Sequence, residues 1–137
     1  MSKKKERNSS TLELSALSKY FGSVKALDGL NLALEPGELV ALLGPSGCGK
    51  TTALRIVAGL ETETAGDIFV NGVRFNLTPA HERDMGMVFQ SYSLFPNMTV
   101  SENIQYGLRA RKIDSKKRAK RVKEMLELVS LESKIDA

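Results

Sequence analysis

The hydrophobic residues in the first half of the chain follow the two-residue period of β-strands. Leucines alternate loosely with polar residues over 12–17 and again over 27–34, which predicts two half-buried strands. A third alternating segment, 68–75, is interrupted by Asn71-Gly72, the strongest short signal for a β-hairpin. We therefore expect a small antiparallel sheet from these segments.

Two short apolar runs have a different character. Leu39–Leu43 and Met85–Phe89 are nearly continuous hydrophobic segments, the pattern of parallel strands buried on both faces. A helix is predicted over Thr51–Ala58 directly after the first run, with Gly59 as its C-terminal stop. A buried strand followed by a helix predicts an α/β core.

Helical spacing dominates near the end of the chain. Val122, Met125, Leu126 and Val129 define one apolar face, and Asp114 or Ser115 is the expected N-cap. The lysines of this segment fall largely on other faces. We interpret them as a solvated surface, with contact to an acidic partner or to lipid head groups as the alternatives.

Composition and charge limit the class of protein. The 137 residues carry a net charge of +4, from 20 Lys+Arg and 16 Asp+Glu, too small a surplus to argue for nucleic acid. No apolar run approaches the roughly 18 residues of a membrane span. The polar, basic N-terminus does not resemble a secretory signal, and the single cysteine, Cys48, fits a reducing compartment. We expect a cytoplasmic chain with a polar tail over residues 1–10.

The most informative motif lies between the buried run and the helix. Residues 44–51 fit G-x-x-x-x-G-K-[ST], the phosphate-binding P-loop. Its glycines let successive backbone N–H groups point at one phosphate chain, and the helix N-terminus adds partial positive charge. Lys50 can reach the β- and γ-phosphates, and the Thr51 hydroxyl can bind Mg²⁺. Cys48 lies within this loop, either as a small filler or as a thiol whose pKa the helix N-terminus lowers.

Several segments of the chain resemble motifs of one protein family, and they occur in the order that is typical of that family. GPSGCGKTT over 44–52 is similar to the Walker A motif of ABC transporter ATP-binding subunits, and residues 19–22 resemble their adenine-stacking loop. Residues 85–96 are similar to the Q-loop of these proteins, and 97–104 to the helix entry that follows it. The resemblance covers 11–137 and is strongest to importers. It implies a P-loop NTPase (RecA-like) core with an antiparallel β subdomain over 11–105 and the beginning of a helical subdomain over 106–137.

The resemblance implies ATP and Mg²⁺ as ligands. Neighbouring strand residues point to opposite faces, so Tyr20 and Phe21 do not both stack on adenine; the family aromatic usually precedes a glycine, which favours Phe21. Gln90 offers a neutral carbonyl to Mg²⁺ or to the attacking water, and Thr51 is the other metal ligand. The expected nucleotide-binding residues are Gly44, Pro45, Ser46, Gly47, Cys48, Gly49, Lys50, Thr51 and Thr52.

Partners also follow from the resemblance. It implies transmembrane permease subunits, a second ATP-binding subunit in a dimer, an indirect link to a substrate-binding protein, no nucleic acid, and a position on the inner face of the cell membrane. The apolar loop at 92–98 either packs in the core or borders the groove for a permease helix. Polyamines, ferric iron, sulfate and sugars all remain as transported substrates.

Several parts of the family machinery do not occur in the sequence. After Gln90 there is no apolar run ending in Asp-Glu and no L-S-G-G-Q signature, and His81 lies too early to be the switch histidine. We therefore expect a C-terminally incomplete domain with an unpaired sheet edge. Three functions remain: an importer ATPase subunit, a nucleotide-binding fragment without hydrolytic activity, and an ABC ATPase without a membrane subunit, which the importer-like Q-loop disfavours.

Overall fold

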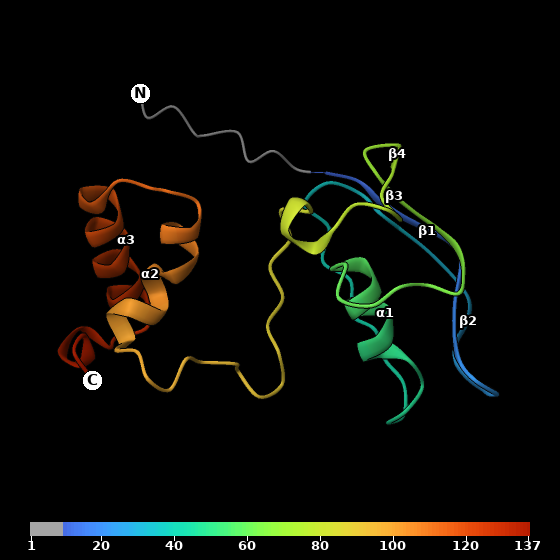
Figure 1. Ribbon diagram of the computed structural model, residues 1–137, viewed down its shortest axis with the longest axis horizontal. Helices are drawn as coiled ribbons and strands as arrows, with labels where there is room; N and C mark the ends of the chain where they lie inside the picture. The colour runs from blue at the N-terminus through green and yellow to red at the C-terminus, as the bar shows by residue number, and fades with distance from the viewer. Residues whose placement is uncertain (1–9) are drawn as a thin grey trace. The chain divides into compact units, whose positions relative to one another are not determined.

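The computed structural model describes residues 10–137. The tail expected over 1–10 lies outside the described residues, except for Ser10. The chain forms two compact units, one ending at Met87 and the other spanning Val88–Ala137, and each is described by itself (Figure 1). The division into a core over 11–105 and a helical segment from 106 stays a prediction.

The first unit contains a four-stranded antiparallel sheet. Its strands are β1 (Leu12–Phe21), β2 (Val24–Leu34), β3 (Ala65–Val70) and β4 (Val73–Arg74), in the spatial order β2-β1-β3-β4. The predicted antiparallel strands and the hairpin are confirmed. Asn71 and Gly72 have φ angles of 51° and 76°, the positive values that a tight I′ hairpin turn requires.

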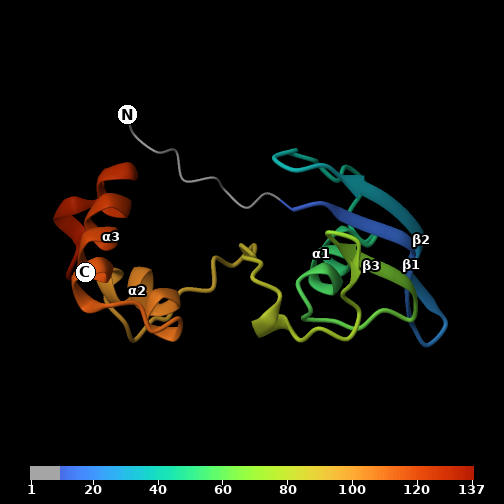
Figure 2. The same cartoon turned by 90° about the horizontal axis from the view of Figure 1, so that it is seen from above.

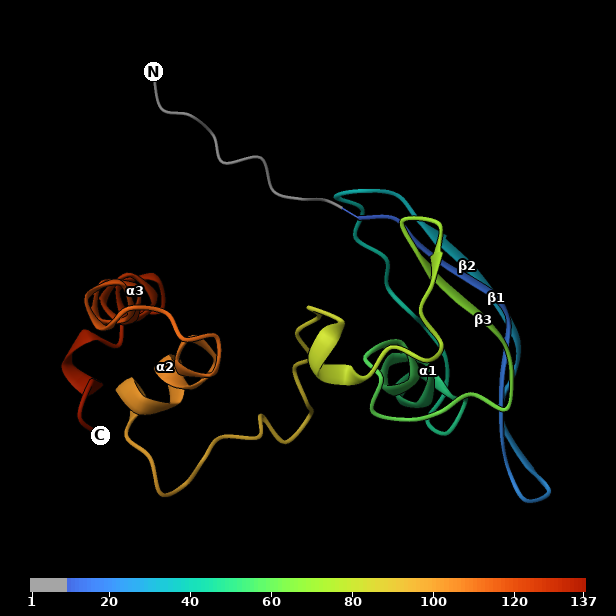
Figure 3. The same ribbon diagram turned by 45° about the horizontal axis from the view of Figure 1, so that its top comes forward.

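A single helix lies against this sheet, and the core forms between them (Figure 3). Helix α1 (Lys50–Val57) contributes the buried Ala53 and Ile56. The helix ends as predicted, because the N–H of Gly59 donates to the carbonyl of Ile56 at 3.0 Å and that of Leu60 to Arg55 at 2.8 Å. The sheet supplies the other buried apolar side chains of this core: Leu14, Leu17, Leu27 and Ile68.

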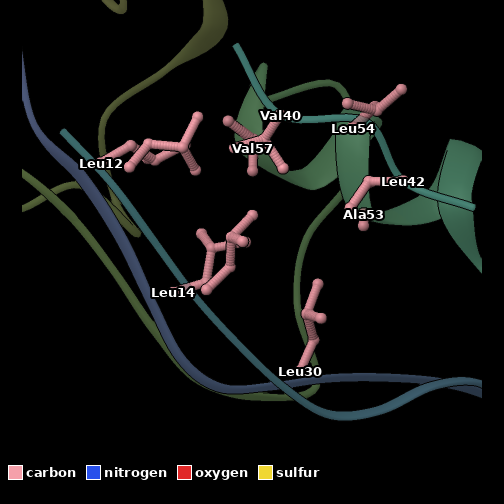
Figure 4. A pocket seen from close by; sticks show the side chains of 10 residues that line it. Leu12, Leu14, Leu30, Val40, Leu42, Ala53, Leu54 and Val57 are labelled. Carbon is pink, nitrogen blue, oxygen red and sulfur yellow. The ribbon is translucent and has the colours of Figure 1, made fainter. Parts of the chain in front are cut away.

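The prediction of two parallel strands is wrong, because neither segment forms a strand within residues 10–137. Leu39–Leu43 is extended, and Val40 and Leu42 point toward the sheet and α1, where they line an apolar cavity of about 100 Å³ (Figure 4). Leu39 and Leu43, on the other face, are 97% and 91% exposed. Met85–Phe89 also lies outside the sheet. Apolar residues alone do not make a central strand, because each strand backbone needs a hydrogen-bonded neighbour. Within residues 10–137, β1–β4 pair only with one another.

An arginine that the sequence analysis did not single out completes this unit. Arg83 is only 6% exposed, and its guanidinium donates to the carbonyls of Ile56 at 3.0 Å and Val57 at 2.9 Å. It also donates to the carbonyls of Thr78 and Asn76. Burial lowers the pKa of Arg83, but an arginine stays charged in a protein. The C-terminal carbonyls of α1 are therefore satisfied by a buried cation.

The second unit is built on two helices that lie side by side (Figure 2). Helix α2 (Val100–Ala110) begins at Thr99, whose side chain forms a capping box with Glu102. Helix α3 (Ser115–Leu128) has Asp114 as its N-cap, one of the two predicted residues. A short 3-10 turn, Glu132–Lys134, follows α3, and another, Ala80–Glu82, belongs to the first unit.

Candidate functional site

The P-loop joins the extended segment 39–43 to α1. Gly49 is the N-cap of the helix, with φ 92°, and Lys50 is its first residue. Because no side chain caps this end, the first N–H groups of α1 remain available to a ligand. The loop is exposed over 44–48. These features are those of an anion-binding helix N-terminus.

The Lys50 side chain folds back over this loop and donates hydrogen bonds to three of its residues. Its ammonium donates to the carbonyl oxygens of Gly44 at 2.6 Å and Pro45 at 2.7 Å, and to the Cys48 sulfur at 3.2 Å. An ammonium has three donors, so the loop uses all of them. An arriving phosphate therefore competes with these partners and gains a charge-assisted hydrogen bond.

Cys48 is exposed, and its thiol is affected directly by this lysine. The hydrogen bond and positive charge of Lys50 lower the pKa of the Cys48 thiol. The expectation of a lowered pKa thus agrees with the geometry: the Lys50 side chain has the largest effect, and backbone hydrogen bonds from Lys50 and Cys48 at the start of α1 add to it. The side chain also fills the loop, since a Cβ on Gly44 would lie 2.7 Å from the Cys48 sulfur.

Gly49 lies against the backbone of β2, and this contact yields a testable prediction. A Cβ at this position would lie 2.1 Å from the carbonyl oxygen of Ala26, in addition to the strain of a positive φ. We expect Gly49→Ala to lower the free energy of unfolding by about 2–5 kcal/mol, combining backbone strain and overpacking. Urea denaturation followed by circular dichroism measures the change.

Gly47 provides the matched control. Its φ is 82°, but a Cβ there meets no atom within 4 Å. Gly47→Ala should therefore cost only the backbone strain, about 1–2 kcal/mol. Equal losses for the two variants would contradict the close approach of the loop to β2.

Tyr20 and Phe21 have different surroundings at the end of β1. The Tyr20 hydroxyl donates to Asp28 at 2.8 Å and Lys25 lies 5.7 Å from its ring centre, so this tyrosine belongs to a surface network. The hydrogen bond from Tyr20 and the charge of Lys25 lower the pKa of Asp28. Phe21 is 50% exposed, with the Lys19 ammonium 4.9 Å from its ring centre. The Phe21 ring is thus the more accessible one, which favours it for stacking.

Thr51 and Gln90, the predicted metal ligands, are both exposed. Hydroxyl and amide oxygens are the hard ligands that Mg²⁺ prefers, so both residues fit the ion chemically. Among residues 10–137, no group of three or more His, Cys, Asp or Glu side chains is arranged to hold a metal. Gln90 belongs to the second unit and Thr51 to the first, so their joint role at one ion stays a prediction.

The loop after Gln90 is held by hydrogen bonds to one asparagine. This residue lies in the motif over 97–104 and had no predicted role. Asn103 on α2 accepts from the N–H of Phe95 at 2.9 Å, and its amide donates to the carbonyls of Phe95, Met98 and Thr99. The Phe95 ring also lies 4.4 Å from that of Tyr106, centre to centre. The asparagine of the motif over 97–104 is therefore the anchor of this loop.

Comparison with known proteins identifies the class. The family model described as "ABC transporter" matches residues 27–137, so this chain belongs to the ABC transporter family of ATP-binding domains. Two solved ABC cassettes agree in fold. One, a dimeric post-hydrolysis state of the cassette MJ0796 bound to ADP and Pi, has a TM-score of 0.79 at 30% identity, over 91% of this chain and 60% of that one. A second dimeric structure of MJ0796 gives a TM-score of 0.80 at 31% identity.

Curated relatives narrow the comparison to import systems. The chain is 49% identical over 124 residues to the Fe(3+) ions import ATP-binding protein FbpC of Pasteurella multocida, covering 90% of this chain and 36% of that protein. It is 51% identical over 116 residues to the "Probable sulfate/thiosulfate import ATP-binding protein CysA" of Chlorella vulgaris, covering 85% of this chain and 49% of that protein. The chain therefore spans about a third to a half of the length of these relatives. The predicted family and fold class are confirmed.

Proposed function

We propose that this chain is the nucleotide-binding part of the ATP-binding subunit of an ABC importer. The observation that carries the proposal is the position of the Lys50 ammonium, 2.6 Å and 2.7 Å from two loop carbonyls at the N-terminus of α1. A cation and free N–H groups in one exposed loop form a site for the phosphates of a nucleotide. The family and the import relatives support ATP as that nucleotide.

Each residue of the site has a distinct role in this proposal. Residues 44–52 surround the phosphates, and Lys50 exchanges its loop partners for the β- and γ-phosphate oxygens. Phe21 stacks on adenine, because a half-exposed ring offers a flat apolar face. Thr51 and Gln90 would each supply a ligand to Mg²⁺, an ion that would neutralise phosphate charge. Gln90, as a neutral ligand, can release the ion without leaving a charge unpaired.

The partners follow from the same class of protein. We infer that the chain works with transmembrane permease subunits, and through them with a substrate-binding protein, on the inner face of the cell membrane. A second ATP-binding subunit is supported by the dimeric cassettes of similar fold. No helix among the described residues has the length and apolar character needed to cross a bilayer. The relatives named for ferric iron and for sulfate favour an inorganic ion as the transported substrate.

The binding function is tested by calorimetric titration of the chain with Mg·ATP. Saturable binding is expected, and a chain that is folded by circular dichroism but binds no ATP would overturn the proposal. A titration by itself does not distinguish an importer subunit from the second candidate, a nucleotide-binding fragment without turnover. The observation that favours this second candidate is that, within residues 10–137, the segment 39–43 that leads into the P-loop is not paired with any strand.

Adenine recognition gives a prediction within the same titration. Phe21→Ala should weaken ATP binding by roughly 5- to 150-fold, the loss of about 1–3 kcal/mol of stacking, whereas Phe21→Tyr should be nearly silent. Tyr20→Ala is the matched control and should affect stability more than affinity, because Tyr20 is bound to Asp28. If Tyr20→Ala carried the loss of affinity and Phe21→Ala did not, the other face of β1 would be the adenine platform.

A further inference from the structure

The connection between α2 and α3 is the most basic part of the described chain. Between residues 109 and 123 the only carboxylate is Asp114, and that carboxylate caps α3 by accepting from the N–H of Lys116 at 3.3 Å. The basic residues of this segment are Arg109, Arg111, Lys112, Lys116, Lys117, Arg118, Lys120, Arg121 and Lys123.

These residues do not all have the same role. Arg118 is half-buried and donates to the carbonyl of Ile113 at 2.7 Å, so it holds the connection in place. Arg121 pairs with Glu124 at 3.0 Å, and Lys120 and Lys123 lie 3.9 Å and 4.0 Å from carboxylates one turn further along α3. Lys112, Lys116 and Lys117 are exposed, and within residues 10–137 no carboxylate lies within ion-pair distance of them. We call these three lysines the basic tip.

The basic tip breaks two rules of helix stability. Apart from the N-cap Asp114, the first turn of α3 has no acidic residue and carries Lys116 and Lys117, although this turn favours carboxylates. Helix α2 in the same unit follows the rule, with Glu102 at the third helical position. Lys112 has φ 55°, a left-handed conformation usually given to glycine at a helix C-terminus. Sites where local rules of stability are broken are candidates for a function.

A bound anion would balance the positive charge of the three lysines, and their chemistry indicates which class of anion fits. Lysines are flexible point charges suited to diffuse attraction, whereas planar, bidentate recognition uses arginine. No aromatic residue lies between 107 and 123, so the tip lacks the stacking platform typical of single-stranded nucleic acid sites. A cluster of lysines on the exposed connection between two helices suits a broad surface of phosphates, as a lipid leaflet presents.

We propose that the basic tip, Lys112, Lys116 and Lys117, binds the anionic phospholipid head groups of a membrane surface. The proposal rests on the proposed function only for its setting, the inner face of the cell membrane. The contact is electrostatic and adds to any permease contact. Salt should weaken it, since the Debye length is about 8 Å at physiological ionic strength.

Vesicle co-sedimentation tests the proposal with the full 137-residue chain, without nucleotide or permease. The chain should bind vesicles of phosphatidylglycerol and phosphatidylcholine and should not bind phosphatidylcholine alone. Replacing the three lysines of the tip by serine should weaken binding on the order of 100-fold, or roughly fivefold per lysine. The matched control replaces Lys3, Lys4 and Lys5 by serine, which removes the same charge from the other basic run.

A second variant separates binding from folding. Lys117→Glu places a carboxylate at the position that Glu102 occupies in α2, so it should raise the melting temperature by roughly 2–4 °C while it weakens vesicle binding. A merely structural role for Lys117 would not move these two quantities in opposite directions.

Three results would overturn the proposal. They are the absence of binding to phosphatidylglycerol vesicles at low salt, a loss in the tail variant equal to that in the tip variant, and tip-dependent binding to double-stranded RNA that is tighter than binding to vesicles. The tip variant should keep its Mg·ATP affinity, and vesicle binding is measured without ATP. The vesicle result therefore does not depend on whether the chain binds ATP, and the ATP result does not depend on whether the chain binds vesicles.

Discussion

Lys50→Ala is expected to weaken Mg·ATP binding by roughly 10- to 150-fold, because hydrogen bonds to a charged partner contribute about 1.5–3 kcal/mol. The ammonium already lies at the loop, where the carbonyls of Gly44 and Pro45 hold it at 2.6 Å and 2.7 Å. Little reorganisation is needed when phosphate arrives. Calorimetric titration of both proteins with Mg·ATP measures the difference.

Arg55 supplies the matched control for this charge change. It is an exposed cation in the last turn of the same helix, at the end away from the loop. Arg55→Ala should leave ATP affinity nearly unchanged, and both variants should keep the circular dichroism spectrum of the wild type. Equal affinity of wild type and Lys50→Ala would remove the basis for the P-loop assignment.

The second large effect concerns turnover. A polypeptide of residues 1–137 should release no phosphate from saturating Mg·ATP above background, with or without permease subunits. Its sequence supplies the loop, Lys50, Thr51 and Gln90, but no Walker B aspartate, adjacent glutamate or signature loop. Phosphoryl transfer depends on all of these groups acting together, and removing several at once leaves little beyond binding.

Contaminating ATPases are the main hazard in this measurement, and Lys50→Ala corrects for them. Phosphate release that is equal in the two proteins is background. Sustained turnover that Lys50→Ala abolishes would contradict the prediction and would mean that this chain obtains its missing groups elsewhere.

Local signals in the sequence predicted most of the fold. The hairpin at Asn71-Gly72 and the helix stop at Gly59 each depend on a few neighbouring residues, and both are found as expected. Asp114 as an N-cap is a signal of the same kind. The segments 39–43 and 85–89 were predicted as strands from composition, but a strand also needs a paired backbone, which composition does not reveal.

In the first unit, too, features that depend on neighbouring residues were predicted, and a feature that depends on residues distant in sequence was missed. The P-loop motif predicted the candidate phosphate site, because its glycines and the Lys50 ammonium act within one short loop, where Lys50 donates to the carbonyl of Gly44 at 2.6 Å. Arg83 was missed because its partners, Ile56 and Val57, lie 27 and 26 residues away along the chain. Periodicity carries no signal for a charged residue whose burial depends on such contacts.

The buried guanidinium of Arg83 also has an electrostatic consequence for the other end of α1. A helix carries about half a positive charge at its N-terminus and half a negative charge at its C-terminus. Because α1 has only 8 residues, its two ends are about 12 Å apart. The negative end would therefore repel each phosphate charge at the loop by about 0.7 kcal/mol at an effective dielectric constant near 20. Arg83 cancels that repulsion at its source, so a helix of barely two turns presents to a nucleotide the net field of a positive pole.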